Sequence, residues 1–337
     1  MHLFKALRFL ALPLTQGYLL PSIVKYSDRL RDSNHHPSVP TVKGNQFTVK
    51  AADGLRLKGS ACGSGMEAIF FVHGWTCNRN IFGFQVARFQ DRYLCVTYDQ
   101  RGHGESEIPG DLDYATETLA SDLDRVIESF DPESFVIAGH SMGGFAALKF
   151  YENYSKKYSG RFKGLALIDS TGTALTDAII FGRLISLVYP NPLGSLLSAL
   201  GKRSDFADRI REFFKETSAA YLLMRLAAFG KTPSARQVEF MKDMVMSTKV
   251  TTIALAARSC LDFDFSDRLS EVKVPTLILV GDKDRLTSLD ANVITQSKMP
   301  SAELILFPGA GHCTLIERPD LVNIEIERFL DGFFSKD

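Results

Sequence analysis

The segment 135–144 constrains the fold of this chain more than any other. It reads FVIAGHSMGG, in which apolar residues rich in β-formers run into a Gly-x-Ser-x-Gly pattern, and the apolar stretch 145–150 with helical character follows. This order predicts a strand, a sharp turn and a helix, with Ser141 at the apex of the turn. The glycines leave room for strand and helix to approach closely. The helix N-terminus offers unpaired N–H groups and a positive dipole end to a developing anion.

Partners for this serine follow later in the chain. A serine hydroxyl needs a base, usually a histidine, and the histidine needs a carboxylate to orient it. Residues 275–280 predict a buried strand that leads to Asp284, and residues 302–307 predict another that leads to His312. Catalytic groups of open α/β sheets lie beyond the carboxyl ends of the strands. Ser141, Asp284 and His312 are therefore the candidate nucleophile, acid and base, with Asp282 and Asp169 as alternatives for the acid.

Two backbone N–H groups are candidates for an oxyanion hole. Residues 68–72 predict a buried strand, and His73-Gly74-Trp75 follows it. Gly74 permits a tight turn that aims the next N–H inward. We expect the N–H of Trp75 to pair with the N–H of Met142, the residue after the serine. Both residues are therefore also candidates for contact with a substrate.

The motifs together resemble the α/β-hydrolase fold, in particular the bacterial serine esterases, lipases and thioesterases that carry a helical cap, and the cofactor-free haloperoxidases. The resemblance spans about residues 45–334 and also includes the glycine-rich turn 99–106. It implies an α/β fold with a mostly parallel central sheet, helices on both faces and an inserted helical cap. It also places the acid on Asp284, in the loop Gly281-x-x-Asp284.

The order of predicted elements agrees with that fold. A hairpin signal around Asp53-Gly54 precedes alternating strands and helices, which is typical of a parallel sheet covered on both faces. The predicted strands cover residues 68–72, 94–98, 135–138, 164–168, 276–280 and 304–307, and the predicted helices cover residues 81–89, 116–130, 142–154 and 319–334. We expect a core of residues 41–170 and 264–337.

The alternation stops between residues 171 and 263, where helical periodicity continues throughout. Candidate helices cover residues 178–188, 194–200, 205–217, 219–228, 234–246 and 249–260. Because this stretch lies between two sheet strands at the edge where Ser141 emerges, it predicts a helical cap over the site. Its many leucines and methionines predict an apolar cavity, although periodicity does not identify which of them line it.

The resemblance implies two-step acyl transfer to Ser141 without a metal or cofactor. The expected substrate is a small-molecule carboxylic ester with a medium-chain or moderately apolar acyl group. A thioester, a lactone, a carbon–carbon bond and cofactor-free perhydrolysis remain alternatives, because the same triad serves them all. A small-molecule-binding module without turnover is the alternative from another class.

Composition limits the possible partners. Lys plus Arg and Asp plus Glu number 39 each and are interspersed, which argues against a nucleic-acid partner. Five cysteines without a CxxC pattern are typical of reduced thiols in a cytoplasmic protein. Residues 1–40 form an apolar, basic segment and linker. Residues 1–24 predict a helix packed on the protein, self-association or peripheral membrane contact, and the sequence leaves the oligomeric state open.

Overall fold

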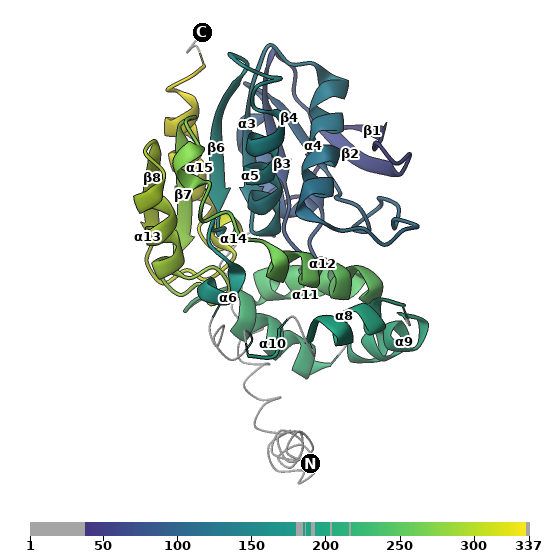
Figure 1. Cartoon of the computed structure of the whole chain (residues 1–337). Helices are drawn as coiled ribbons and strands as arrows, with labels where there is room; N and C mark the ends of the chain where they lie inside the picture. Colours follow the sequence, from purple (N-terminus) through teal and green to yellow (C-terminus); the bar gives the residue numbers. More distant parts are fainter. Residues whose placement is uncertain are drawn as a thin grey trace.

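The computed structural model describes residues 38–179, 185, 187–189, 193–202, 204–215 and 217–334. These residues form an eight-stranded sheet in the order β1-β2-β4-β3-β5-β6-β7-β8 (Figure 1). Strand β2 runs antiparallel to both of its neighbours, and the remaining pairs are parallel. The strands are β1 (Asn45–Lys50), β2 (Arg56–Cys62), β3 (Glu67–Val72), β4 (Leu94–Tyr98), β5 (Ser134–His140), β6 (Phe162–Ile168), β7 (Thr276–Gly281) and β8 (Ala302–Phe307).

Helices cover both faces of this sheet, which confirms the predicted fold class. Helices α4 (Thr116–Phe130) and α5 (Met142–Tyr154) pack on one face, and α3 (Gly83–Phe89) and α15 (Pro319–Leu330) pack on the other. The central strands are buried on both sides and therefore read as continuous apolar runs. The remaining elements here are η1 (Arg79–Phe82), η2 (Leu269–Glu271), α13 (Leu289–Lys298) and α14 (Thr314–Glu317).

A group of helices lies between β6 and β7. Figure 1 shows α8–α12 gathered beyond the end of the sheet toward which the arrow of β6 points. We call α8–α12 the cap helices. The helices between β6 and β7 are α6 (Leu175–Ala178), α8 (Leu193–Lys202), α9 (Ser204–Lys215), α10 (Ser218–Ala228), α11 (Ala235–Ser247) and α12 (Val250–Asp262). Helix α11 begins with a capping box between Ser234 and Gln237, which fixes its start.

The helix expected over residues 178–188 does not begin as predicted. The sequence favours a helix over residues 178–188, but α6 ends at Ala178 and Ile179 is extended. The carbonyl of Ala178, a buried residue, accepts the N–H of Ser288 at 3.2 Å, so a tertiary contact replaces continuation of the helix. Most of the remaining stretch lies outside the described residues.

The predictions for residues 1–24 also lie outside the described residues, and the cytoplasmic location stays a prediction. Within the part of the chain that the structure describes, the helices are all too short or too polar to cross a bilayer.

Candidate active site

Ser141 lies at a strained turn between β5 and α5. Its backbone has φ 51° and ψ −120°, a conformation that a residue with a side chain adopts only under constraint. Three hydrogen bonds provide the constraint. The N–H of Ser141 donates to the carbonyl of Ile168 at 3.0 Å, and its own carbonyl accepts the N–H of Gly144 and the hydroxyl of Ser170, each at 2.8 Å. The turn therefore holds the serine at the carboxyl edge of the sheet.

The glycines of the motif allow helix α5 to approach the sheet. A Cβ atom on Gly143 would lie 2.0 Å from the carbonyl oxygen of Val72 in β3. A Cβ atom on Gly139 would lie 2.5 Å from the carbonyl oxygen of Gly143. Side chains at either position would push strand and helix apart, which explains the Gly-x-Ser-x-Gly spacing.

Ser141, His312 and Asp284 form a continuous hydrogen-bonded chain. Nε2 of His312 lies 2.9 Å from the hydroxyl oxygen of Ser141, and Nδ1 lies 2.9 Å from Oδ2 of Asp284. His312 and Asp284 are each 6% exposed. This geometry places a base against a hydroxyl and a carboxylate behind the base, the arrangement that activates a serine.

The two alternative carboxylates, Asp282 and Asp169, are hydrogen-bonded to groups other than His312. Asp282 accepts the N–H of Gly309 at 2.6 Å and pairs with Lys283 at 3.0 Å. Asp169 follows β6 and accepts the backbone N–H and the hydroxyl of Thr314, both at 2.8 Å. Burial and the nearby Asp284 raise the pKa of the Asp169 carboxyl well above its ordinary value. Of the three carboxylates, Asp284 is the one bonded to His312.

The environment of His312 shifts its protonation equilibrium. Burial of the imidazole favours the neutral form, but the Asp284 carboxylate, with Asp169 and Glu317 behind it, outweighs burial and raises the pKa of His312. A base with a raised pKa accepts a proton from a hydroxyl more readily.

Three other histidines surround the site and stay neutral. Burial lowers the pKa of His73 to about 4 and those of His103 and His140 to about 3. Nε2 of His73 accepts the N–H of Gln100 at 2.9 Å, which braces the start of the loop after β3. The ring of His140 lies 5.3 Å from that of His312, and its Nε2 lies 3.0 Å from the carbonyl oxygen of His312. These histidines support the loops around Ser141.

The expected oxyanion-hole donors are the backbone N–H groups of Trp75 and Met142. Met142 is the first residue of α5, so its N–H has no carbonyl within the helix to receive it. Among the described residues, neither N–H has a backbone or side-chain acceptor. The side chain of Met142 is fully buried in the core, so any contact of Met142 with a substrate involves its backbone.

Glu317 joins the histidine loop to the end of α10. Its buried carboxylate accepts the N–H of Gly311 at 2.7 Å and the N–H of Gly230 at 2.9 Å. The N–H of His312 donates to the carbonyl of Ala228 at 2.9 Å. The loop that carries His312 is therefore hydrogen-bonded directly to the segment that follows a cap helix. Sequence reasoning missed Glu317, because nothing in its local sequence distinguishes it from a surface glutamate.

Thr287 was also missed, although a local signal exists. Its hydroxyl donates to Oδ2 of Asp284 at 2.7 Å and lies 3.4 Å from Nδ1 of His312. The spacing Asp284-x-x-Thr287 at the start of a loop favours such a local bond between the two side chains.

An apolar cavity of about 300 Å³ opens onto Ser141 and His312. Helices α10, α11 and α12 and the loop after β3 supply most of its wall. The methionines and leucines of the cap divide between the cavity, the core and the surface. The lining includes Trp75, Leu223, Met224, Met241, Val245, Met246, Ile253 and Leu286.

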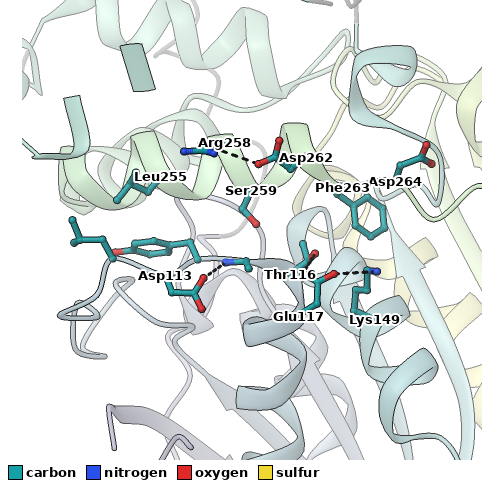
Figure 2. Close-up of a pocket in the computed structure, with 13 residues that line it drawn as sticks. Asp113, Thr116, Glu117, Lys149, Leu255, Arg258, Ser259, Asp262, Phe263 and Asp264 are labelled. Carbon is teal, nitrogen blue, oxygen red and sulfur yellow. Dashed lines mark hydrogen bonds and ion pairs between the residues drawn. The ribbon is translucent and has the colours of Figure 1, made fainter. Parts of the chain in front are cut away.

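A second cavity, of about 390 Å³, lies between the N-terminal end of α4 and helix α12. Figure 2 shows Asp113, Thr116 and Glu117 on one side and Arg258 and Ser259 on the other. Its charges are largely paired: Lys149 contacts Glu117 at 3.1 Å and Arg258 contacts Asp262 at 3.6 Å. The triad residues do not line this cavity. In the described parts of the chain, no three His, Cys, Asp or Glu side chains are grouped to hold a metal.

The fold and this site define an α/β hydrolase. A family model described as alpha/beta hydrolase fold matches residues 67–319, and the chain belongs to that family. The chain is 30% identical to the AB hydrolase superfamily protein YisY of Bacillus subtilis, over 77% of this chain and 90% of the relative. It is 26% identical to a non-heme chloroperoxidase of Burkholderia pyrrocinia, over 79% of this chain and 92% of the relative.

A solved structure shares the fold. A thermophilic esterase from Thermogutta terrifontis superposes with a TM-score of 0.69, covering 87% of this chain and 100% of the esterase. The two sequences are 21% identical, so this likeness concerns the fold.

Proposed function

We propose that this protein is a serine hydrolase that cleaves carboxylic esters with a medium-chain or moderately apolar acyl group through an acyl-enzyme. The observation that carries the proposal is the hydrogen-bonded chain from Ser141 through His312 to Asp284, which opens onto an apolar cavity. The match to the family model described as alpha/beta hydrolase fold supports the same class of reaction.

In the proposed mechanism His312 removes the proton of Ser141 as the hydroxyl oxygen attacks the ester carbonyl. Asp284 holds the imidazole in the correct tautomer and stabilises the imidazolium. The N–H groups of Trp75 and Met142 bind the tetrahedral oxyanion. His312 then protonates the leaving alcohol, and water attacks the acyl-enzyme in the second half of the cycle.

The lining of the cavity supports an uncharged acyl chain. Among the described residues that line it, the ionisable side chains are those of His312, His140, Cys77 and Cys313, and burial raises the pKa of both thiols. A charged substrate group would lose its hydration there without gaining a partner. A volume of about 300 Å³ lies at the lower end of ligand pockets, which favours medium over long chains.

The same proposal divides the chain by role. Residues 41–170 and 264–337 form the core that carries the triad, and residues 171–263 form the cap that shapes the acyl pocket. The contacts of α10–α12 with the cavity support this division.

Steady-state hydrolysis of p-nitrophenyl esters from acetate to palmitate tests the proposal. We expect turnover with an optimum at intermediate chain length, and a loss of at least about 10⁴-fold in kcat for Ser141→Ala. Ser297→Ala, an exposed serine on α13, is the matched control and should match the wild type. Absence of turnover across the series, or near-normal activity in Ser141→Ala, would overturn the assignment.

A further inference from the structure

The loop that carries the Trp75 N–H contains a strained turn. The N–H of Cys77 donates to the carbonyl of Gly74 at 3.1 Å, so Trp75 and Thr76 occupy the two central positions of a β-turn. Thr76 has φ 59°. Turns with a positive φ at this position normally carry glycine or asparagine there. A β-branched residue in the left-handed region is a conformational outlier, so something must hold it.

Thr76 is held from two sides. Its N–H donates to Nε2 of His103 at 3.3 Å, and its hydroxyl donates to the carbonyl of Trp75 at 2.6 Å. Its carbonyl accepts the hydroxyl of Thr248 at 3.2 Å, and the same hydroxyl lies 3.4 Å from the carbonyl oxygen of Met244. His103 belongs to the core, whereas Thr248 lies at the end of α11, between two cap helices. Strained conformations persist only when the surroundings over-determine them in this way.

The neighbouring residue of the turn is bonded to the same part of the cap. The indole N–H of Trp75 donates to the carbonyl of Ile253 in α12 at 2.9 Å. Both central residues of the turn therefore have a hydrogen bond to the cap segment 248–253. Thr76 and Thr248 are 5% and 4% exposed, so water does not readily substitute for the bond between them.

We propose that Thr248 is a positioning residue for the oxyanion hole. Its hydroxyl holds the strained turn at Thr76 and thereby aims the Trp75 N–H, so the oxyanion hole is complete only while the cap rests on the core. This inference rests on the proposed function, because it gives the Trp75 N–H its role. Positioning matters here because donors must lie within hydrogen-bond distance of the place where the oxyanion forms.

The chain offers a matched control for this contact. Thr252, in the first turn of α12, is fully buried and its hydroxyl donates to the carbonyl of Gly102 at 3.0 Å. That bond also joins the cap to the core through a threonine, but it does not reach the turn at Thr76. A general loosening of the cap would affect both threonines alike, whereas loss of positioning is specific to Thr248.

Kinetics of three variants test the proposal. Thr248→Val, which keeps the shape and removes the hydroxyl, should lower kcat about tenfold with KM within about twofold. Thr248→Ser should restore kcat, and Thr252→Val should keep kcat within about twofold of the wild type. Thr248→Val should also lose about tenfold in affinity for a boronic-acid transition-state analogue. Equal losses in Thr248→Val and Thr252→Val, or no loss in either, would overturn the proposal.

A double-mutant cycle separates positioning from a folding defect. Thr76→Gly removes the strain, so adding Thr248→Val to Thr76→Gly should cost less than about threefold in kcat. An undiminished tenfold loss in that background would contradict the proposal. Folding of every variant is checked by its thermal unfolding midpoint.

A second readout does not depend on turnover. Trp75 is the single tryptophan of the chain, so tryptophan emission, excited at a wavelength that the ten tyrosines do not absorb, reports on this turn alone. Thr248→Val should increase acrylamide quenching of Trp75, while Thr248→Ser should not. If the wild type hydrolyses no ester, the proposed function fails, and quenching still tests the contact between the cap and the turn. Unchanged quenching in a folded Thr248→Val would overturn the contact itself.

Discussion

The hydroxyl of Thr287 donates to Oδ2 of Asp284 at 2.7 Å, the same oxygen that faces His312. The other carboxylate oxygen accepts the N–H groups of Leu286 and Thr287 at 2.8 and 2.9 Å. Both oxygens of the acid are therefore fixed by its own loop. The carboxylate keeps one orientation toward the imidazole even without substrate.

Removing the Thr287 hydroxyl should weaken catalysis without abolishing it. Thr287→Val should lower kcat/KM by about tenfold, because the hydroxyl helps to orient the carboxylate while two backbone bonds still hold Asp284. Thr287→Ser should retain activity. The measurement is kcat/KM on the optimal ester, and equal activity in the valine variant would show that the backbone bonds suffice.

The pH dependence of hydrolysis should follow His312. The base acts in its neutral form, so kcat/KM should rise with pH through a pKa above the ordinary value of 6.5. Asp284→Asn removes the nearest group that raises this pKa. The variant should therefore show its acid limb at lower pH, together with a loss of about 10⁴-fold in kcat.

Asp169→Asn is the control for the loss of kcat in Asp284→Asn. Asparagine tolerates a positive φ, which is 45° at Asp169, and its amide oxygen can still accept from Thr314. We expect kcat within about threefold of the wild type, since Asp169 does not contact His312. If Asp169→Asn lost as much kcat as Asp284→Asn, the assignment of the acid to Asp284, after β7, would be wrong.

A buried ion pair should dominate the stability of the glycine-rich turn after β4. Arg101 donates to Asp122 of α4 at 2.7 and 2.8 Å, and both residues are 1% exposed. Asp122→Ala leaves a buried guanidinium without its main partner and should cost about 3–5 kcal/mol in urea unfolding. Glu128→Ala breaks an exposed pair with Arg125 on the same helix and should cost less than about 1 kcal/mol.

Chain-length preference should respond to one methionine of α11 and not to another. Met241 lines the apolar cavity, whereas the equally buried Met244 is absent from its lining. Met241→Ala should shift the ester optimum toward longer chains. Met244→Ala should leave the optimum unchanged, although both variants lose about 2–5 kcal/mol of stability. Parallel shifts in both variants would indicate that the cavity is not the acyl pocket.

The sequence located the turn at Ser141 because the glycines of this turn are required by close backbone contacts, which leave a local pattern. It could not choose between Asp282 and Asp284 from the residues alone. The two carboxylates are neighbours in the same loop, and only the folded loop directs one of them to His312. The family resemblance supplied that choice.

The residues that line the cavity could not be predicted from the sequence, for a different reason. Each cap helix carries apolar residues, and periodicity does not distinguish a side chain facing the cavity from one facing the core or solvent. Met241 faces the cavity, while Phe213 of α9 is 77% exposed. The end of α6 at Ala178 could not be predicted either, because it depends on a hydrogen bond from Ser288, which is distant in the sequence.

The two hydrogen bonds that Glu317 accepts limit which parts of this enzyme can be exchanged separately. One donor, Gly311, precedes the base, and the other, Gly230, follows a cap helix. Deleting the cap, or replacing it with one whose backbone follows another course at Gly230, would remove the second donor and leave the Glu317 carboxylate with one partner fewer. Chimeras should therefore transfer the cap and residues 309–317 together, as one unit.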